Sequence, residues 1–152
     1  MVRINNGFCS MCTSLESIEI PKEVTFIGWE SFSNCHELKS VVLPASLNKL
    51  EGNNFNFDWS LKDVTYYAKT VPVLGDLCFH RETEYGLIDR LYVPAEAIED
   101  YKNSDWAQYF NEILPIDISG VEAIIDMEKN RTYKVYNTNG IRIINSDNSA
   151  FK

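Results

Sequence analysis

The chain has 152 residues, of which 45% are hydrophobic and 24% charged, as is typical of a globular protein of about one domain. Its formal net charge of -8 repels phosphate backbones and argues against nucleic acid as the main partner. No run of about 18 apolar residues occurs, so we expect no membrane-spanning helix. Residues 1–7 lack the apolar core of a signal peptide. We therefore expect either a cytoplasmic protein or a fragment whose export signal lies upstream.

An internal repeat with a period of 23 runs through the first half of the chain. The segment at residues 14–21 recurs at 37–44 and, less closely, at 60–67. Other apolar positions follow the same step without gaps, because Ile4 aligns with Ile27 and Leu50, and Val24 aligns with Leu47. Several apolar columns at one fixed spacing indicate a repeat architecture in which each unit buries its apolar face against its neighbours.

The repeated segment reads as a short strand. Alternation at Ile18, Glu19 and Ile20 is followed by Pro21, which cannot donate to a strand ladder. Stacking equivalent strands about 4.8 Å apart would join them into a continuous apolar spine. We predict two buried columns of aligned side chains, Leu15/Leu38/Leu61 and Ile18/Val41/Val64.

Each repeat also holds a second extended segment and a corner. Residues 24–28 and 47–51 read as the second strand, and residues 31–35 turn the corner, with Phe32 and Cys35 in the interior. Cys9 and Cys12 have the spacing of half a zinc site, but no second such pair completes it. The repeat explains Cys9, Cys12 and Cys35 as packing positions. We expect Cys12 and Cys35 to be interior, and all four cysteines, including Cys78, to be free.

The stretch from Ile20 to Leu38 carries the pattern Ile-Pro-x-x-Val-Thr-x-Ile-Gly-x-x-x-Phe-x-x-Cys-x-x-Leu. It resembles the BspA-like leucine-rich repeat of bacterial surface proteins over about residues 4–72. Trp29 and Ser31 depart from the small residues usual at their positions, and the third repeat is degraded. The resemblance implies the C-terminal portion of a secreted or surface-attached protein of the kind implicated in adhesion.

After the three repeats of residues 1–72, the first of them incomplete, the period of 23 stops. We interpret residues 73–115 as an α/β C-terminal cap, with a helix from Ala95 to Tyr101 and an apolar helical face over residues 106–113. The end of this segment, Tyr-Val-Pro followed by a Tyr-x-x-x-x-x-Trp stretch, is similar to the ending usual in the family.

Residues 116–152 read as a linker and a β-hairpin tail, because alternating runs flank an Asn-Gly turn at residues 139–140. The tail could serve in sorting or attachment, or be a mobile remnant. The predicted fold class is thus mainly β with some helix: a short leucine-rich-repeat solenoid of 23-residue repeats, an α/β cap and a small β-hairpin tail.

The sequence offers little chemistry. Cys78 and His80 could mimic a thiol nucleophile and its base, but no orienting group or oxyanion element accompanies them. His36 reads as a solvent-facing corner residue. The carboxylates of Glu96, Glu99 and Asp100 lack the spacing of a calcium loop and read as a solvated helix face. We expect no catalytic residue, no metal and no cofactor.

Binding is the favoured function, with a protein or glycan ligand that the sequence does not identify. The candidate contact residues are aromatic, although packing explains each equally well: Trp29, Trp59, Tyr66 and Tyr67. A purely structural spacer or attachment segment is the alternative, favoured by the small polar side chains on the expected sheet face, and an enzyme is a remote one. We also expect a homodimer through the uncapped N-terminal repeat, residues 1–26.

Overall fold

The computed structural model describes residues 2–116, and the backbone of residues 134–136 and 142–145. Short strands dominate it: β1 (Val2–Ile4), β2 (Ser17–Glu19), β3 (Val24–Ile27), β4 (Ser40–Leu43), β5 (Lys49–Leu50), β6 (Asp63–Tyr66), β7 (Val73–Leu74), β8 (Ile88–Val93) and β9 (Phe110–Pro115). Helical turns are few: η1 (Thr83–Tyr85), η2 (Ala95–Ala97), α1 (Ile98–Lys102) and η3 (Asp105–Tyr109). The chain divides into two compact units at residues 116 and 117.

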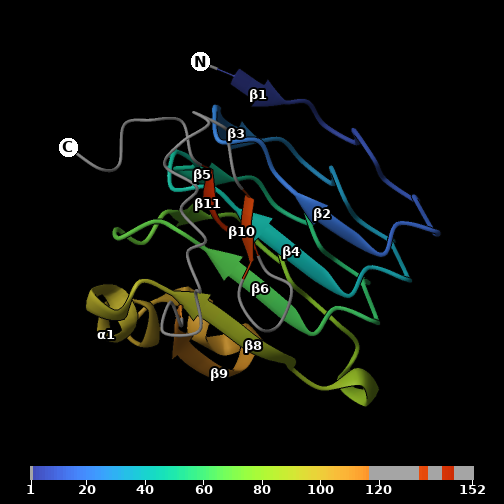
Figure 1. The fold of residues 1–152 in the computed structure, drawn as a ribbon. Coiled ribbons are helices and arrows are strands. Elements are labelled where there is room, and N and C mark those ends of the chain that lie inside the picture. Colours follow the sequence, from blue (N-terminus) through green and yellow to red (C-terminus); the bar gives the residue numbers. More distant parts are fainter. Residues whose placement is uncertain (1, 117–133, 137–141, 146–152) are drawn as a thin grey trace. The chain divides into compact units, whose positions relative to one another are not determined.

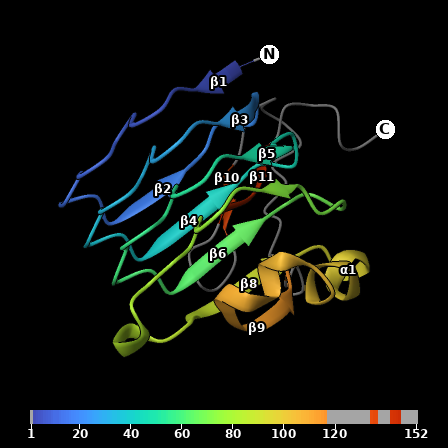
Figure 2. The same ribbon diagram turned by 180° about the vertical axis from the view of Figure 1, so that it is seen from behind.

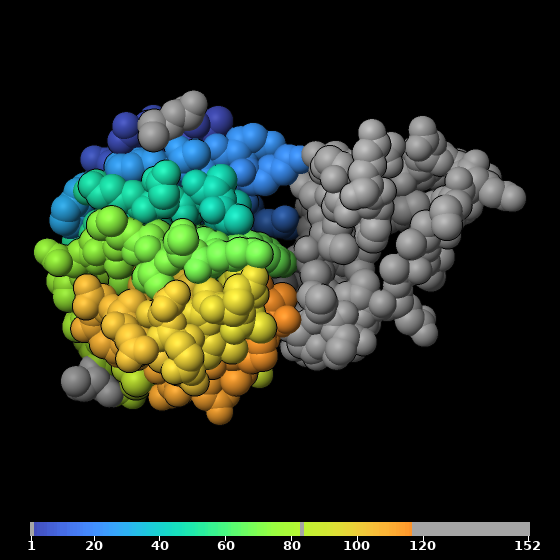
Figure 3. All heavy atoms as spheres, turned by 90° about the vertical axis from the view of Figure 1, so that its left-hand side faces the viewer, coloured from blue at the N-terminus to red at the C-terminus, as the bar shows by residue number. Residues whose placement is uncertain are grey.

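The strands of the first unit form two parallel sheets, in the orders β1-β3-β5-β7 and β2-β4-β6-β8-β9 (Figures 1 and 2). The chain visits the sheets alternately, so that each turn, here called a rung, adds one strand to each sheet. Ser17 pairs with Ser40, and Ser40 pairs with Asp63. Pairing between β2, β4 and β6 therefore follows the period seen in the sequence. Figure 3 shows the rungs of this unit layered in chain order, from blue to orange.

The core lies between the two sheets. Leu38, Val41, Leu61 and Val64 are buried, as the sequence predicts for the two columns. Leu15 and Ile18 of the same columns are only partly buried. Their rung is the first, so within the described residues β2 has a neighbouring strand on one side alone. Burial in a stacked fold depends on having a rung above as well as below.

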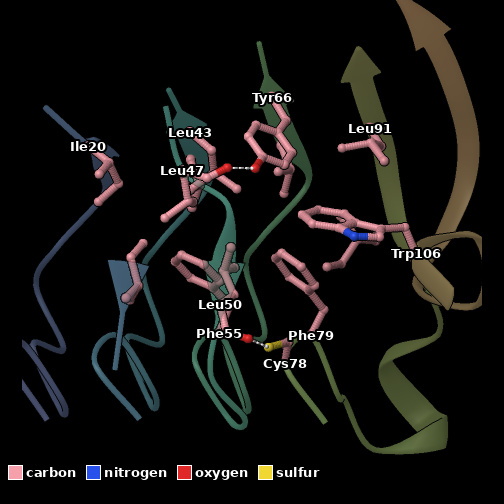
Figure 4. Packing of buried hydrophobic residues seen from close by; sticks show 14 of the residues in the cluster. Ile20, Leu43, Leu47, Leu50, Phe55, Tyr66, Cys78, Phe79, Leu91 and Trp106 are labelled. Carbon is pink, nitrogen blue, oxygen red and sulfur yellow. Dashed lines mark hydrogen bonds between the residues drawn. The ribbon is translucent and has the colours of Figure 1, made fainter. Parts of the chain in front are cut away.

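Aromatic rings from successive rungs form a column through this core (Figure 4). The ring centroids of Phe32 and Phe55 lie 5.5 Å apart, and those of Phe55 and Phe79 lie 5.2 Å apart. Phe8 contacts Phe32 edge-on at one end, and Trp106 contacts Phe79 at the other. Stacked and edge-to-face rings at such distances stabilise a core beyond the area that they bury.

Residues with positive φ recur at fixed positions of the corners. Gly7, Glu30 and Asn53, which occupy equivalent positions in successive repeats, have φ between 53 and 64°. Met11, Asn34 and Phe57 form a second such series with φ of 61–62°. Glycine and asparagine adopt this conformation with the least strain, which explains their presence at these steps. The corners are thus sharp turns of one repeated geometry.

Polar side chains link the rungs inside the corners. The side-chain oxygen of Asn54 accepts a hydrogen bond from the Ser31 amide 3.1 Å away, and its nitrogen donates to the Glu51 carbonyl. The Asp58 carboxylate accepts from the Cys35 amide at 2.7 Å. Asn54 and Asp58 are buried. Such bonds satisfy backbone groups that a corner would otherwise leave unpaired.

The cysteine expectation is half wrong. Cys35 and Cys78 are free and buried. Cys9 and Cys12, expected to be reduced, instead form a disulfide across the corner of the first rung. Their Cα atoms lie 5.5 Å apart, well within disulfide range, because the tight corner folds the two residues together. The packing column explains Cys35, whose thiol donates to the Cys9 carbonyl.

Stacking continues beyond residue 72, although the step changes. Val73 and Leu74 pair with β5, and β8 pairs with β6. Leu74 lies beside Leu50 and Leu91 lies beside Val64, so both steps are longer than the regular period. The loss of that period at residue 72 thus marks extra residues in a fourth rung, and not an end to the ladder.

The last part of the first unit covers the end of the core. The segment expected to be helical, residues 95–101, consists of η2 and of α1, which ends one residue later at Lys102. The apolar helical face expected over residues 106–113 is wrong, because η3 ends at Tyr109 and Phe110–Pro115 form β9. The open edge of β8 provides backbone partners for this segment, and parallel pairing joins Leu91 to Ile113.

In the second unit, β10 (Lys134–Tyr136) and β11 (Arg142–Asn145) pair antiparallel, with Val135 opposite Ile144. The strands agree with the alternating runs of the sequence. The Asn-Gly turn and the rest of the tail lie outside the described residues.

Candidate binding surface

The four aromatic candidates from the sequence fall into three different environments. Tyr66 has an exposed fraction of 0%, and its hydroxyl donates a hydrogen bond to the Leu47 carbonyl. Its ring packs against Trp106 inside the core (Figure 4), and it also contacts Tyr101 edge-on. Tyr66 points inward because it alternates with Thr65 and so shares the inner face of β6 with Val64. It cannot contact a ligand in this fold.

Trp29 lies on the surface, with 44% of it exposed. Its ring covers Gly52 of the next rung, where an added Cβ would lie 2.4 Å from the ring atom Cζ3. Gly52 therefore provides the space into which this indole settles. Tyr67 is half-buried after β6. The Trp29 side chain thus packs between two rungs and keeps one side exposed.

Trp59 belongs to a cluster of rings that we call the aromatic corner: His36, Phe57, Trp59, His80 and Tyr85. The Trp59 and Tyr85 rings stack with centroids 4.3 Å apart, and His36 stacks over Trp59 at 6.0 Å. Phe57 contacts both Trp59, at 5.3 Å, and His80, at 6.3 Å. Three successive rungs contribute to the corner, since the residues come from the β3–β4, β5–β6 and β7–β8 connections.

Tyr85 reaches the corner because the fourth rung is longer than the others. The connection between Phe79 and Leu91 contains three more residues than the equivalent stretch between Phe55 and Val64, and η1 forms within it. Tyr85 is 43% exposed and Leu87 is similarly exposed, while Trp59 is half-buried. Insertions in repeat proteins gather on one face, which is often the face that binds.

Arg81 fastens this inserted segment to the rung above. Its guanidinium donates hydrogen bonds to the carbonyls of Trp59, Leu61 and Leu87. Burial lowers the pKa of this guanidinium, while the negative charges of Asp89 and Asp58 oppose that change. Five fixed donors let one arginine bridge several carbonyls, so the segment that carries Tyr85 is held in place.

Asp58 lies buried beneath the corner. Burial raises its pKa to about 8, against the opposing effects of the Cys35 amide hydrogen bond and of Arg81. Its second carboxylate oxygen is buried without a hydrogen-bond partner among the described residues. The side chain links rungs and is closed off from solvent, so it offers no general acid or base to a ligand.

The thiol–imidazole pair considered from the sequence does not form a reactive site. Cys78 has no exposed surface, and its thiol donates to the Glu51 carbonyl at 2.8 Å. Burial raises the pKa of this thiol to about 12, which keeps it protonated and a poor nucleophile. His80 instead packs against Phe57 in the aromatic corner.

Two of the three acidic candidates are engaged in surface ion pairs, and Asp100 is exposed. Glu96 pairs with Lys69 at 2.8 Å, and Glu99 pairs with Lys102 at 2.9 Å. In the part of the chain that the structure describes, no three His, Cys, Asp or Glu residues gather as a metal site would require. None of the helices described here is long and apolar enough to cross a membrane.

A comparison with known protein families agrees with the stacked strands and the repeated corners. A model described as the BspA type leucine-rich repeat region matches residues 2–98 in six copies. The chain belongs to the BspA-type leucine-rich-repeat family. None of the curated proteins matches the chain. The BspA-type match extends past residue 72 into the fourth rung, in agreement with the continued pairing of β7 and β8. Repeats of this family are generally non-catalytic and often act as surface protein-interaction modules.

Sequence reasoning missed most of the aromatic corner. His36 and Trp59 occupy equivalent positions in successive repeats, so their shared column was available from the repeat. Tyr85 gave no such signal, because it lies in the segment that breaks the period.

Proposed function

We propose that this chain is a non-catalytic binding module of a bacterial surface or secreted protein, that it mediates adhesion, and that the aromatic corner is its contact surface. In this proposal the first unit is a short solenoid of 23-residue repeats that continues through the longer fourth rung of β7 and β8 and is closed by α1, η3 and β9, and residues 116–152 are a linker and hairpin tail. The supporting observation is the column formed by His36, Trp59 and Tyr85 on the outside of the stack.

Aromatic residues support this assignment because they supply large contact areas at a low cost in conformational entropy, and they are enriched where interfaces derive most of their energy. The corner is also rigid, since Arg81 ties its inserted segment to the neighbouring rung. A preorganised surface loses less entropy when it binds than a mobile one.

A spacer or attachment segment is the second candidate. The outward strand positions are mostly polar, with Val42 as the apolar member: Ser17, Glu19, Ser40, Val42, Asp63 and Thr65. A spacer would make no contact through the corner, so one experiment separates the two functions.

The test is adhesion of beads that carry the full chain to surfaces coated with purified extracellular host proteins and glycoproteins. We expect binding to at least one coat, lost in Trp59→Ala and Tyr85→Ala and kept in Trp29→Ala, which removes an exposed indole elsewhere. Circular dichroism of each variant would confirm folding. No binding to any coat would support the spacer, and equal loss in all three variants would exclude the corner as the contact surface.

A further inference from the structure

The way in which the rings of the aromatic corner pack restricts what they can bind. Trp59, the largest ring, stacks with His36 of the preceding rung and with Tyr85 of the next, at interplanar angles of 25° and 22°. With two rings stacked on it, the half-buried indole offers little of its faces to a ligand. Tyr85 is the last ring of the column among the described residues and stacks with Trp59, and its 43% exposure leaves aromatic surface open to a ligand.

This arrangement is a poor platform for a sugar. Stacking of a flat ligand requires a free ring face, and the indole of Trp59, which would offer the largest one, already stacks with two other rings. A guanidinium group needs less room, because it is a small planar cation that stacks on a single tyrosine face and still donates hydrogen bonds from its edge. Leu87, exposed two residues beyond Tyr85, offers apolar surface to the aliphatic stem of such a side chain.

The charge around the corner points to the same ligand. Four exposed carboxylates flank its residues in the sequence: Glu37, Glu82, Glu84 and Asp89. Of the cations near these residues in the sequence, Lys39 pairs with Glu16, Arg90 pairs with Asp63, and the Arg81 guanidinium donates to backbone carbonyls, which leaves Lys62. The uncommitted charge is therefore negative, as it is for the whole chain at -8. Complementary charge accelerates association and excludes partners of the wrong sign.

We propose that the aromatic corner binds an arginine-containing, basic segment of a partner protein, with a guanidinium stacked on Tyr85 and paired with the carboxylates of Glu82 and Glu84. The inference rests on the proposed binding function and specifies the chemistry of its ligand. It does not depend on which protein carries the segment.

Matched synthetic peptides titrated into the full chain test this proposal. Binding is measured by calorimetry and by tryptophan fluorescence. The probe is a short capped peptide of glycine and serine with several arginines. Its controls replace each arginine by lysine, by the neutral isostere citrulline, or by glutamate. We expect the arginine peptide to bind, the lysine peptide to bind several-fold more weakly, and the other two not to bind. Added salt should weaken binding, since the contact pairs opposite charges at the surface.

Protein variants locate the site. Tyr85→Ala should weaken arginine-peptide binding about tenfold, the value of one good cation–π contact. Glu82→Gln with Glu84→Gln should weaken it several-fold and reduce its salt dependence. Glu96→Gln with Glu99→Gln removes two carboxylates at a distant helix and should change nothing.

Several results would overturn the inference. Equal binding of the arginine and citrulline peptides would exclude a guanidinium site, and equal weakening by the two double glutamine variants would reduce the effect to overall charge. Binding of neutral oligosaccharides that is lost in Tyr85→Ala would replace the proposal with a glycan site. If beads adhere to a protein coat through Trp59 while the arginine peptide does not bind, the proposed function stands and this inference alone fails.

Discussion

One column of aromatic rings runs through the stack, and its two ends differ in how far their side chains are exposed. At the N-terminal end, Phe8 is 68% exposed and Met11 is 72% exposed. At the other end, Trp106 has an exposed fraction of 0%, and Tyr101 is equally buried. A repeat cannot cover its own end, since it presents the same apolar face that it buries in its neighbours. Closing the stack requires a sequence that departs from the repeat.

The departure consists of α1, η3 and β9. Tyr101 of α1 donates a hydrogen bond from its hydroxyl to the Ala68 carbonyl at 3.1 Å, which joins the helix to the chain after β6. Trp106 of η3 packs against the rings of Tyr66 and Phe79 (Figure 4) and contacts Tyr101 as well. The closed end is therefore held by large aromatic side chains.

Of the variants considered, Trp106→Ala should lower the free energy of unfolding most. Removing a fully buried indole costs about 3–5 kcal/mol of unfolding free energy, since the packed strands around the cavity cannot collapse into it. Phe8→Ala, at the open end of the same column, should cost less than about 1 kcal/mol. Urea unfolding followed by circular dichroism measures both.

Trp106→Phe serves as the control, because the indole nitrogen of Trp106 is buried without a hydrogen-bond partner among the described residues. The variant should keep most of the stability that the alanine variant loses. Similar costs for Trp106→Ala and Phe8→Ala would contradict the assignment of open and closed ends.

A second pair of variants sharpens the comparison within one column. Leu38→Ala should cost about 2–5 kcal/mol, because Leu38 is buried between two rungs. Leu15→Ala should cost clearly less, since Leu15 is only partly buried. The free energy of unfolding from urea titration is the measurement. A larger loss for Leu15 than for Leu38 would show that the first rung is covered in solution.

Asp58 allows a test that depends on pH. Burial raises its folded-state pKa to about 8 from an ordinary 3.8, so the folded state retains this proton while the unfolded chain loses it. The stability that the protonated group contributes is complete below pH 3.8 and is lost as the pH rises towards 8.

Asp58→Asn cannot ionise and keeps the acceptor for the Cys35 amide. Its stability relative to the unmodified chain should therefore rise with pH across this window, by at most about 1.4 kcal/mol per pH unit. Thermal or urea unfolding of both proteins at several pH values tests the slope. A difference that does not vary with pH would mean that Asp58 titrates as an ordinary carboxyl.

The smallest expected effect concerns self-association. Strands β1 and β2 each have one neighbouring strand among the described residues, and Phe8 and Met11 are exposed beside them. We predict a homodimer through residues 1–26, since open strand edges with exposed apolar side chains pair readily. Light scattering over a concentration series should show it.

Phe8→Ser with Met11→Ser should shift this equilibrium towards monomer, whereas Trp29→Ser, which removes an exposed ring elsewhere, should not. A strict monomer at high concentration would refute the prediction.

The sequence predicts those parts of the fold that repeat. The column Leu15, Leu38 and Leu61 is sufficient to predict three strands side by side, because the apolar residues and the strand pairing follow the same spacing. The sequence does not reveal the fourth rung. The numbers of residues from Leu50 to Leu74 and from Val64 to Leu91 are larger than the repeat and unequal, so the alignment of Val64 with Leu91 is hidden. Aligned apolar residues define a period only while the connections keep one length.

The remaining differences have local causes. The Cys9–Cys12 disulfide follows from the fold of one corner, which apolar patterning does not describe. Residues 110–113 have helical spacing, yet the open edge of β8 draws them into a strand. Of the candidate site, Trp59 was predicted because it is aromatic. Its neighbour Tyr85 comes from a different rung, and only the folded chain brings the two together.

The parallel, in-register pairing has a consequence for how such a gene can change. Because Ser17 pairs with Ser40, and Ser40 with Asp63, removing one complete repeat between two equivalent positions would place Ser17 beside Asp63 with both ladders intact. A deletion that is not a whole number of repeats would shift the register and move inward side chains to the solvent. Recombination between repeats can therefore shorten or lengthen the protein by whole rungs. The longer fourth connection and the closing helices do not repeat, so such an exchange leaves them as a single copy.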